Sequence, residues 1–176
     1  MNVFILNSGR CGSSTFIQAC QHIKNYSAAH ESLSTQLGDK RLAYAQNHIE
    51  ADNRLCWVLG RLDKKYADNA VYVHLYREVN DTIKSFVKRM DYGIMQAYRD
   101  GVLMGCGRDI NETAIANDYL LTIETNIECF LKDKSQQMKF SMENAKEDFK
   151  KFWDLISAEG DLEAALAEWD VAYNKS

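Results

Sequence analysis

A short turn near the start of the chain has the residue types of an anion-binding loop. It contains Gly9, Arg10 and Gly12, followed by three consecutive hydroxyl residues at positions 13–15. Glycines permit the positive φ angles that aim successive backbone N–H groups at one point. Apolar residues at helical spacing follow, so the N-terminus of a helix would face the same point, and the arginine would add a positive charge. These features predict the binding of a phosphate or sulfate group.

The loop differs from the nucleoside-triphosphate loop of kinases at one position. The kinase pattern, Gly-x-x-x-x-Gly-Lys-Ser/Thr, requires a lysine after its second glycine. Here Ser13 follows Gly12, and the basic residue, Arg10, comes two positions before that glycine. A small-molecule kinase would also need a carboxylate that binds magnesium, so this class of enzyme is kept only as an alternative.

A second predicted phosphate site lies at another junction between a strand and a helix. The apolar run 71–76 reads as a buried strand that ends at Arg77, and Ser85 lies eight residues later on the helix that follows. An arginine at the end of a strand offers a charged, forked donor, and a helical serine adds a hydroxyl to the same phosphate. Taken alone, each residue is more simply a solvated surface residue. The order of the two motifs along the chain favours a ligand.

Both motifs resemble sites of the sulfotransferases. The run from Gly9 to Ser14 looks like the 5′-phosphosulfate loop of that family, particularly of its carbohydrate branch, in which Arg-x-Gly-Ser/Thr-Ser/Thr follows the first strand. The spacing Arg-x7-Ser resembles the family's site for the 3′-phosphate, although residues 78–80 replace a proline that the family often has. The resemblance implies 3′-phosphoadenosine 5′-phosphosulfate (PAPS) as the cofactor and its desulfated form, PAP, as a product. The cofactor-binding residues that it implies are Arg10, Cys11, Gly12, Ser13, Ser14, Thr15, Arg77 and Ser85.

The same resemblance makes His30 and Glu31 candidates for the general base. They end a short predicted strand, and ligands of open α/β sheets bind beyond the carboxyl ends of the strands. Sulfotransferases similar to this chain carry a glutamate or a histidine in this region. Because adjacent residues of a strand point to opposite sides, we expect only one of the two to reach the acceptor. We favour Glu31 as the base, with His30 as an orienting residue or as the alternative base.

Strand-like and helix-like segments alternate along the chain and predict an α/β fold. Short strands are expected at 3–6, 26–30, 48–51, 71–76 and 138–142. Helical periodicities predict helices that start after the first loop and at 53, 80, 111, 144 and 162. We therefore expect a three-layer P-loop-type fold, a single domain over 1–176 with a parallel sheet of about five strands flanked by helices.

Two further segments are expected near the acceptor. The polar residues 36–47 are predicted to line the acceptor side as a loop or short helix. Residues 91–109 combine glycines with aromatic residues and methionines, which predicts either a mobile cover over the acceptor pocket or an irregular helix and loop.

Composition places the chain among soluble globular proteins and argues against nucleic-acid partners. The 176 residues carry a net charge of −4, and 46% of them are hydrophobic. No apolar run approaches the length of a membrane span. Residues 140–176 hold nine acids and four bases, and residues 1–139 hold sixteen acids and seventeen bases, so no strongly basic groove is indicated. The sequence also has no metal-ligand spacing, and no metal site is expected.

The five cysteines are odd in number and scattered, which indicates a reducing compartment, and we expect the cytoplasm. Cys11 stands apart because it lies beside Arg10 and near a predicted helix N-terminus, a setting that lowers the pKa of a thiol. The alternative, which we favour, is a small residue that merely fits the turn.

These observations lead to one functional hypothesis and two alternatives. We expect an enzyme that transfers the sulfuryl group of PAPS to a hydroxyl or amine of a small-molecule or glycan acceptor. Arg10 would stabilise the charge on the leaving phosphate and on the transferring group. The alternatives are a P-loop small-molecule kinase and a non-catalytic module that binds PAPS or another nucleotide.

Overall fold

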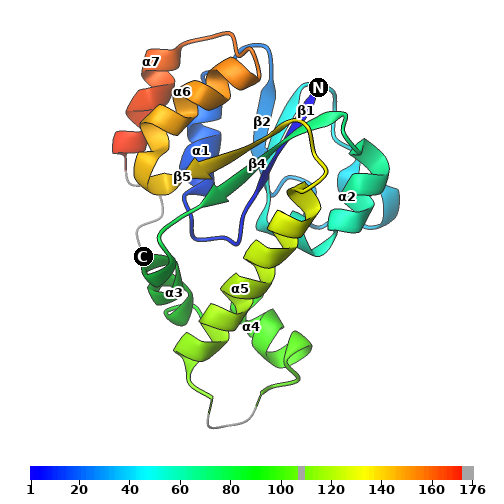
Figure 1. Ribbon diagram of the computed structural model, residues 1–176, viewed down its shortest axis with the longest axis vertical. Helices are drawn as coiled ribbons and strands as arrows, with labels where there is room; N and C mark the ends of the chain where they lie inside the picture. The colour runs from blue at the N-terminus through cyan, green and yellow to red at the C-terminus, as the bar shows by residue number, and fades with distance from the viewer. Residues whose placement is uncertain (107–109, 172–176) are drawn as a thin grey trace.

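Five parallel strands form one sheet with helices on both of its faces in the computed structural model of the chain, which describes residues 1–106 and 110–171 (Figure 1). The strands lie in the order β2-β3-β1-β4-β5, and all neighbouring pairs are parallel. Their bounds are β1 Asn2–Leu6, β2 Ser27–His30, β3 His48–Ala51, β4 Ala70–Tyr76 and β5 Gln137–Ser141. The predicted α/β fold with a five-stranded parallel sheet is confirmed.

The connections between the strands carry helices and short helical turns. The α-helices are α1 Ser13–Cys20, α2 Leu59–Tyr66, α3 Val79–Val87, α4 Gly93–Ala97, α5 Glu112–Leu131, α6 Ala145–Leu155 and α7 Leu162–Ala167. Single turns of 3₁₀ or π type lie at Gly38–Leu42, Asn53–Trp57, Tyr98–Val102, Met142–Asn144 and Glu168–Asp170. Among the described residues, no helix is both long and apolar enough to cross a membrane.

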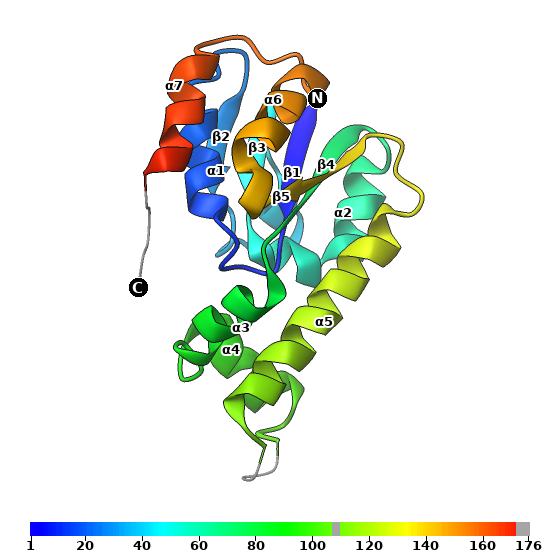
Figure 2. The same ribbon diagram turned by 60° about the vertical axis from the view of Figure 1, so that its left-hand side comes forward.

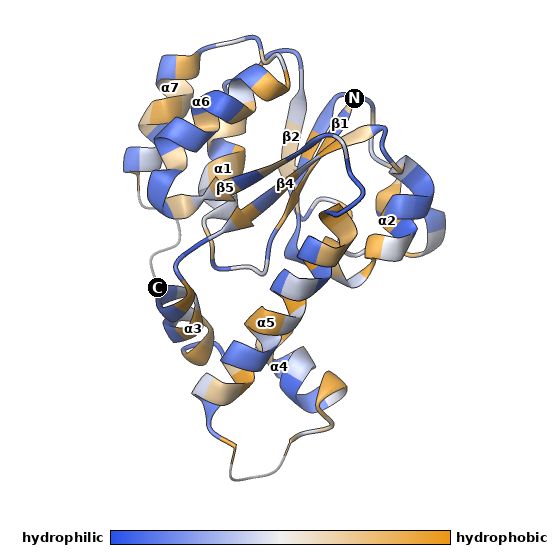
Figure 3. Cartoon of the chain, viewed as in Figure 1, coloured by the Kyte–Doolittle hydropathy of each residue, from blue (hydrophilic) through white to orange (hydrophobic). Residues whose placement is uncertain are grey.

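The central strand β1 is buried on both faces, as its continuous apolar run predicts. Val3 and Ile5 pack in one core with residues of α1, α6 and α7, whereas Phe4 and Leu6 pack in a second core with residues of α2, α3 and α5. Figure 3 shows hydrophobic and hydrophilic residues alternating along α5 and α6, the pattern of helices that cover a sheet with one face. The sheet is thus the middle of three layers.

Two helix starts differ from the sequence-based expectation. Helix α3 begins at Val79, because the carboxylate of Glu78 accepts the N–H of Asp81 and acts as the N-cap in place of a cap at position 80 or 81. Asn144 precedes α6 as expected, but its side chain makes no capping hydrogen bond. At α3 a side-chain hydrogen bond that the pattern does not reveal sets the boundary, whereas at α6 the predicted cap residue is in place without its capping bond.

Helices α3 and α4 and one end of α5 extend beyond the carboxyl ends of the strands (Figures 1 and 2). Part of the predicted segment 91–109 forms this extension, with α4 and the turn Tyr98–Val102. Residues 107–109 of that segment lie outside the described residues. The extension therefore lies beside the turns that follow β1 and β2, at the carboxyl edge of the sheet (Figures 1 and 2).

The segment between α6 and α7 packs against the residues that follow α1, and Gly160 allows this contact to be tested. Gly160 has a φ of +149°, and a Cβ at this position would overlap the carbonyl oxygen of His22. We expect Gly160→Ala to lower the free energy of unfolding by about 1–3 kcal/mol, as overpacking does.

Gly60→Ala in α2 is the matched control, because no atom lies within 4 Å of its added Cβ. The higher helix propensity of alanine should raise the free energy of unfolding by up to about 1 kcal/mol. Urea unfolding followed by circular dichroism measures both variants, and equal effects of the two substitutions would contradict the packing at Gly160.

Candidate functional site

The turn between β1 and α1 has the left-handed backbone that its glycines predict. Gly9 and Gly12 have φ angles of +93° and +89°, and Arg10 between them has +61°. The side chain of Asn7 holds the turn: its Oδ1 accepts the N–H of Gly9 at 2.9 Å, and its Nδ2 donates to the carbonyl of Ile5 at 3.0 Å. Successive residues in this conformation form a concave row of N–H groups that suits an anion.

Helix α1 begins at the end of this turn without a side-chain cap. Gly12 is the N-cap and provides no side-chain hydrogen bond, and the first turn of the helix contains no acidic residue. The first N–H groups of a helix need a capping side chain, water or a ligand as partner. A Cβ at Gly12 would overlap Sδ of Met142, and its φ disfavours any side chain, so the position requires glycine.

The two predicted phosphate motifs meet through one hydrogen bond. Arg10 Nε lies 2.8 Å from Oγ of Ser85, which α3 carries to the loop. Burial lowers the pKa of Arg10, and the positive charges of Arg89 and Arg77 lower this pKa further, although Tyr92 opposes the shift. A guanidinium remains protonated in proteins. The cluster therefore concentrates positive charge beside the loop, which attracts an anion.

Arg77 lies at the edge of this cluster. Its Nη2 is 3.6 Å from a carboxylate oxygen of Asp81, one turn later on α3, and both side chains are partly exposed. An exposed pair at this distance contributes little to stability, so a ligand phosphate can replace Asp81. Ser85 is hydrogen-bonded to Arg10, whereas Arg77 only lowers the pKa of Arg10 through its charge.

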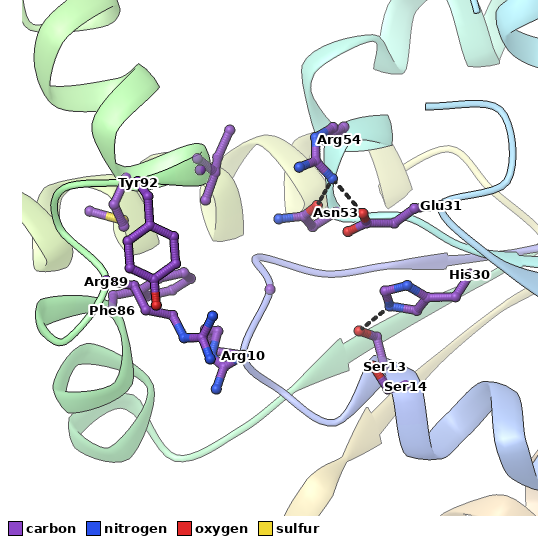
Figure 4. Close-up of a pocket in the computed structure, with 14 residues that line it drawn as sticks. Arg10, Ser13, Ser14, His30, Glu31, Asn53, Arg54, Phe86, Arg89 and Tyr92 are labelled. Carbon is purple, nitrogen blue, oxygen red and sulfur yellow. Dashed lines mark hydrogen bonds and ion pairs between the residues drawn. The ribbon is translucent and has the colours of Figure 1, made fainter. Parts of the chain in front are cut away.

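A cavity of about 270 Å³ lies between the loop, the end of β2 and the helices α3 and α4 (Figure 4). Of the predicted site residues, the cavity is lined by Arg10, Ser13, Ser14, His30 and Glu31. The others do not line it: Cys11, Gly12, Thr15, Arg77 and Ser85.

His30 and Glu31 both line the cavity, and the expectation that only one of them reaches the acceptor stays a prediction. His30 Nε2 lies 3.0 Å from the hydroxyl oxygen of Ser13, and Glu31 Oε2 lies 2.8 Å from Nη1 of Arg54 (Figure 4). Glu31 lies one residue beyond β2 and has a φ of +53°. The alternation of side chains along a strand therefore does not apply to it.

A buried carboxylate of β3 fixes the turn that carries Glu31. The N–H of Glu31 donates to the carbonyl of Ala51 at 3.0 Å and continues the pairing of β2 with β3. The N–H and the hydroxyl of Ser32 donate to the two oxygens of Glu50, at 2.7 and 2.6 Å. Glu50 is fully buried, and Nε2 of His48 lies 2.9 Å from it, so several polar partners compensate the buried charge.

Asp52 fixes the position of Arg54 in a similar way. One of its oxygens accepts the N–H of Arg54 at 2.8 Å, and the other pairs with the guanidinium of Arg41. Asp52 and Arg41 are almost fully buried. Asp52 caps the 3₁₀ turn Asn53–Trp57. The single helix predicted from 53 is divided at Val58, whose φ of −130° is not helical, and α2 starts only at Leu59.

Two expectations about neighbouring residues are corrected. The segment 36–47 contains the short helical turn Gly38–Leu42, as expected, but none of its residues lines the cavity, and Arg41 is paired with Asp52. The thiol of Cys11 lies within the core that contains Phe16, and burial raises its pKa to about 12, which contradicts the less favoured interpretation of a thiol with a lowered pKa beside Arg10. Any contribution of Cys11 to the site comes from its backbone.

Sequence analysis missed two charged residues of the cavity, Arg54 and Arg89, and also the uncharged lining residues Asn53 and Phe86. Arg54 follows the predicted strand 48–51, whose carboxyl end lies at the edge where ligands bind in such folds. Arg89 comes four residues after Ser85, a spacing that places side chains on one face of a helix. Both signals were present in the sequence. Tyr92 and its successors up to Met95, from the segment predicted as a cover, also line the cavity.

No family model matches the chain, and no curated protein matches its sequence. Among solved structures, a sulfotransferase domain from the curacin biosynthetic pathway is similar, with a TM-score of 0.64 and 17% sequence identity. The similarity covers 92% of this chain and 75% of that one. The two chains share a fold, and nothing in the likeness points to the carbohydrate branch.

The buried thiol of Cys11 gives a prediction that separates it from an exposed cysteine. At pH 8 a thiol with a pKa near 12 is about 10⁻⁴ ionised, and only the thiolate reacts. We expect iodoacetamide to modify the exposed Cys129 at least about 100 times faster than Cys11. Peptide mass spectrometry over a time course measures both rates. Comparable rates would mean that the thiol faces the loop and not the core.

Proposed function

We propose that the chain is a sulfotransferase that moves the sulfuryl group of PAPS to a hydroxyl or amine of a small-molecule or glycan acceptor. The hydrogen bond between Arg10 and Ser85 carries the proposal, because it joins two phosphate motifs from separate strand–helix junctions. The cavity beside that bond also contains His30 and Glu31, both able to accept a proton. The fold shared with a sulfotransferase domain supports the same activity.

In this proposal the donor binds to the loop and to α3. The N–H groups of residues 12–15 and the guanidinium of Arg10 bind the phosphosulfate. The hydroxyl of Ser85 accepts a hydrogen bond from Arg10 and keeps its own proton, which it donates to the 3′-phosphate. Arg77 exchanges its weak pair with Asp81 for the same phosphate.

The reaction needs a base, and we assign this role to Glu31. Arg54 binds Oε2 of Glu31 and fixes its orientation, so that Oε1 can take the proton of the acceptor. The acceptor oxygen or nitrogen then forms a bond to sulfur while the bond from sulfur to the bridging oxygen breaks, and PAP leaves with that electron pair. Arg10 stabilises the charge on the leaving phosphate. His30, held by Ser13, orients the acceptor or replaces Glu31 as base.

The two alternatives account for less of the site. A kinase of this fold class needs the loop lysine that Ser13 replaces. A module that only binds a nucleotide has no need of His30 and Glu31 at the cavity, yet both line it. The sulfotransferase reaction uses the loop, the second motif and these two residues together.

The first test concerns the donor. We expect PAP at 100 times its dissociation constant to raise the free energy of unfolding by about 2.7 kcal/mol, and ATP with magnesium to raise it much less. Arg77→Ala should reduce the preference for PAP over AMP, because only PAP carries the 3′-phosphate. Thermal unfolding at a series of ligand concentrations measures both effects.

Lys84→Ala is the matched control, because Lys84 is an exposed cation of α3 that pairs with Asp81, as Arg77 does. It should leave the preference for PAP unchanged. Stabilisation by ATP–magnesium equal to that by PAP would overturn the proposed donor. An unchanged ratio in Arg77→Ala would remove Arg77 from the 3′-phosphate site.

The second test concerns the base. We expect Glu31→Gln to lower the turnover number by about 10²–10⁴ and to leave the affinity for PAP unchanged, because the base touches the acceptor and not the phosphates. His30→Asn should have the smaller effect of a residue that positions the acceptor. Glu128→Gln, at an exposed position of α5, controls for the loss of a carboxylate.

Steady-state kinetics with labelled PAPS and calorimetric titration with PAP measure these effects. If His30→Asn abolishes turnover while Glu31→Gln retains most of it, the two roles are exchanged. If both variants keep full activity, neither residue is the base.

A further inference from the structure

Arg89 is a cavity residue with an unsatisfied donor. It lies two residues after the end of α3 at Val87, and it lines the cavity. Its Nε is buried and has no hydrogen-bond partner. Among the described residues, no carboxylate forms an ion pair with Arg89. A buried guanidinium N–H without a partner is unfavourable, and a ligand oxygen would satisfy it.

The charges that line the cavity do not balance. The lining contains three arginines, Arg10, Arg54 and Arg89, and one carboxylate, Glu31. Glu31 is paired with Arg54, so the lining offers Arg89 no carboxylate of its own. The two guanidinium groups are close enough for Arg89 to lower the pKa of Arg10. A cavity with this excess of positive charge favours anionic ligands.

The proposed donor accounts for Arg10 but not for Arg89. Arg10 belongs to the phosphosulfate loop and is hydrogen-bonded to Ser85 of the second motif. Arg89 belongs to neither motif. Its guanidinium carbon lies 5.5 Å from the ring centroid of Tyr92, and this cation–π contact directs the group along the wall formed by α3 and α4.

Arg89 and the candidate bases lie on different sides of the cavity. In Figure 4, Arg89 and Tyr92 lie on the side of α3 and α4, whereas His30 and Glu31 lie on the side of β2. Phe86, Ile94 and Met95 supply apolar surface to the lining near Arg89. A molecule that places its hydroxyl or amine beside Glu31 would extend along this apolar surface and place its far end beside Arg89.

We propose that Arg89 and Tyr92 form a subsite for a negatively charged group of the acceptor, so that the acceptor is a small hydroxyl- or amine-bearing anion. The group is a carboxylate, a phosphate or a sulfate, which guanidinium binds through paired N–H donors. The reacting hydroxyl or amine and this group are separated by an apolar portion of the molecule. The inference rests on the proposed function and extends it to the class of acceptor.

The test uses pairs of acceptors that differ only in the charged group. The probes are 4-hydroxyphenylacetate with its neutral amide, and glucose 6-phosphate with glucose. With PAPS as donor, we expect the charged member of at least one pair to have a kcat/KM at least about tenfold higher, mainly through KM. Arg89→Met keeps an apolar stem of similar length and should remove this preference, and Arg89→Lys should restore part of it.

Lys88→Met is the matched control, because it removes the adjacent, exposed cation outside the cavity lining. It should keep the preference of the unchanged protein. Absence of a preference for the charged member in every pair would overturn the subsite. An equal loss of turnover with charged and neutral acceptors in Arg89→Met would also overturn it, because Arg89 would then act on the transferring group.

Calorimetric titration separates this inference from the proposed function. PAP is titrated first, and the four probes are then titrated into protein with and without PAP. Binding of a charged probe that Arg89→Met abolishes supports the subsite, even if PAP does not bind and the proposed function fails. Binding of PAP together with equal binding of charged and neutral probes would overturn the subsite and leave the proposed function standing.

Discussion

The hydrogen bond from Arg10 Nε to Ser85 Oγ is the contact on which the arrangement of the site depends. The left-handed turn after β1 places the arginine at the carboxyl edge of the sheet, and β4 brings α3 to the same edge. This side-chain hydrogen bond connects the loop to α3 and so brings the two predicted phosphate motifs together. The bond fixes the guanidinium of Arg10 beside α3. A charged hydrogen bond of this kind is also stronger than one between neutral groups.

The opposite wall is organised by two buried carboxylates. Glu50 binds the turn that carries Glu31, and Asp52 binds the backbone of Arg54. Burying a carboxylate is unfavourable unless donors surround it, and each of these has several. Their effect is to hold Glu31 and Arg54 in contact. The polar residues of β3 and its end therefore set the geometry of the cavity, although Glu50 and Asp52 do not line it.

Sequence reasoning predicted most of the fold because apolar runs and helical periodicity reflect burial directly. Each predicted strand is present within one residue at either end. It predicted the loop from glycine and hydroxyl content, and the edge position of His30 and Glu31 from the rule for open α/β sheets. It failed where a contact between distant parts of the chain, or a local turn, determines the environment of a side chain. Rules for neighbouring charge gave Cys11 a lowered pKa, yet its side chain points into the core and burial dominates. Strand alternation does not apply to Glu31, because a positive φ turns the chain there.

Helix α3 and the turn after it contribute residues to both the proposed donor site and the proposed acceptor subsite. Ser85 contacts the loop arginine, and Arg89, one turn later, reaches the cavity. Any rotation or shift of α3 that accompanies donor binding therefore displaces Arg89 as well. By thermodynamic linkage, the factor by which the donor changes the affinity for the second ligand equals the factor by which that ligand changes the affinity for the donor. Helix α3 and the turn after it would thus couple the affinities of the two substrates equally, whichever of them binds first.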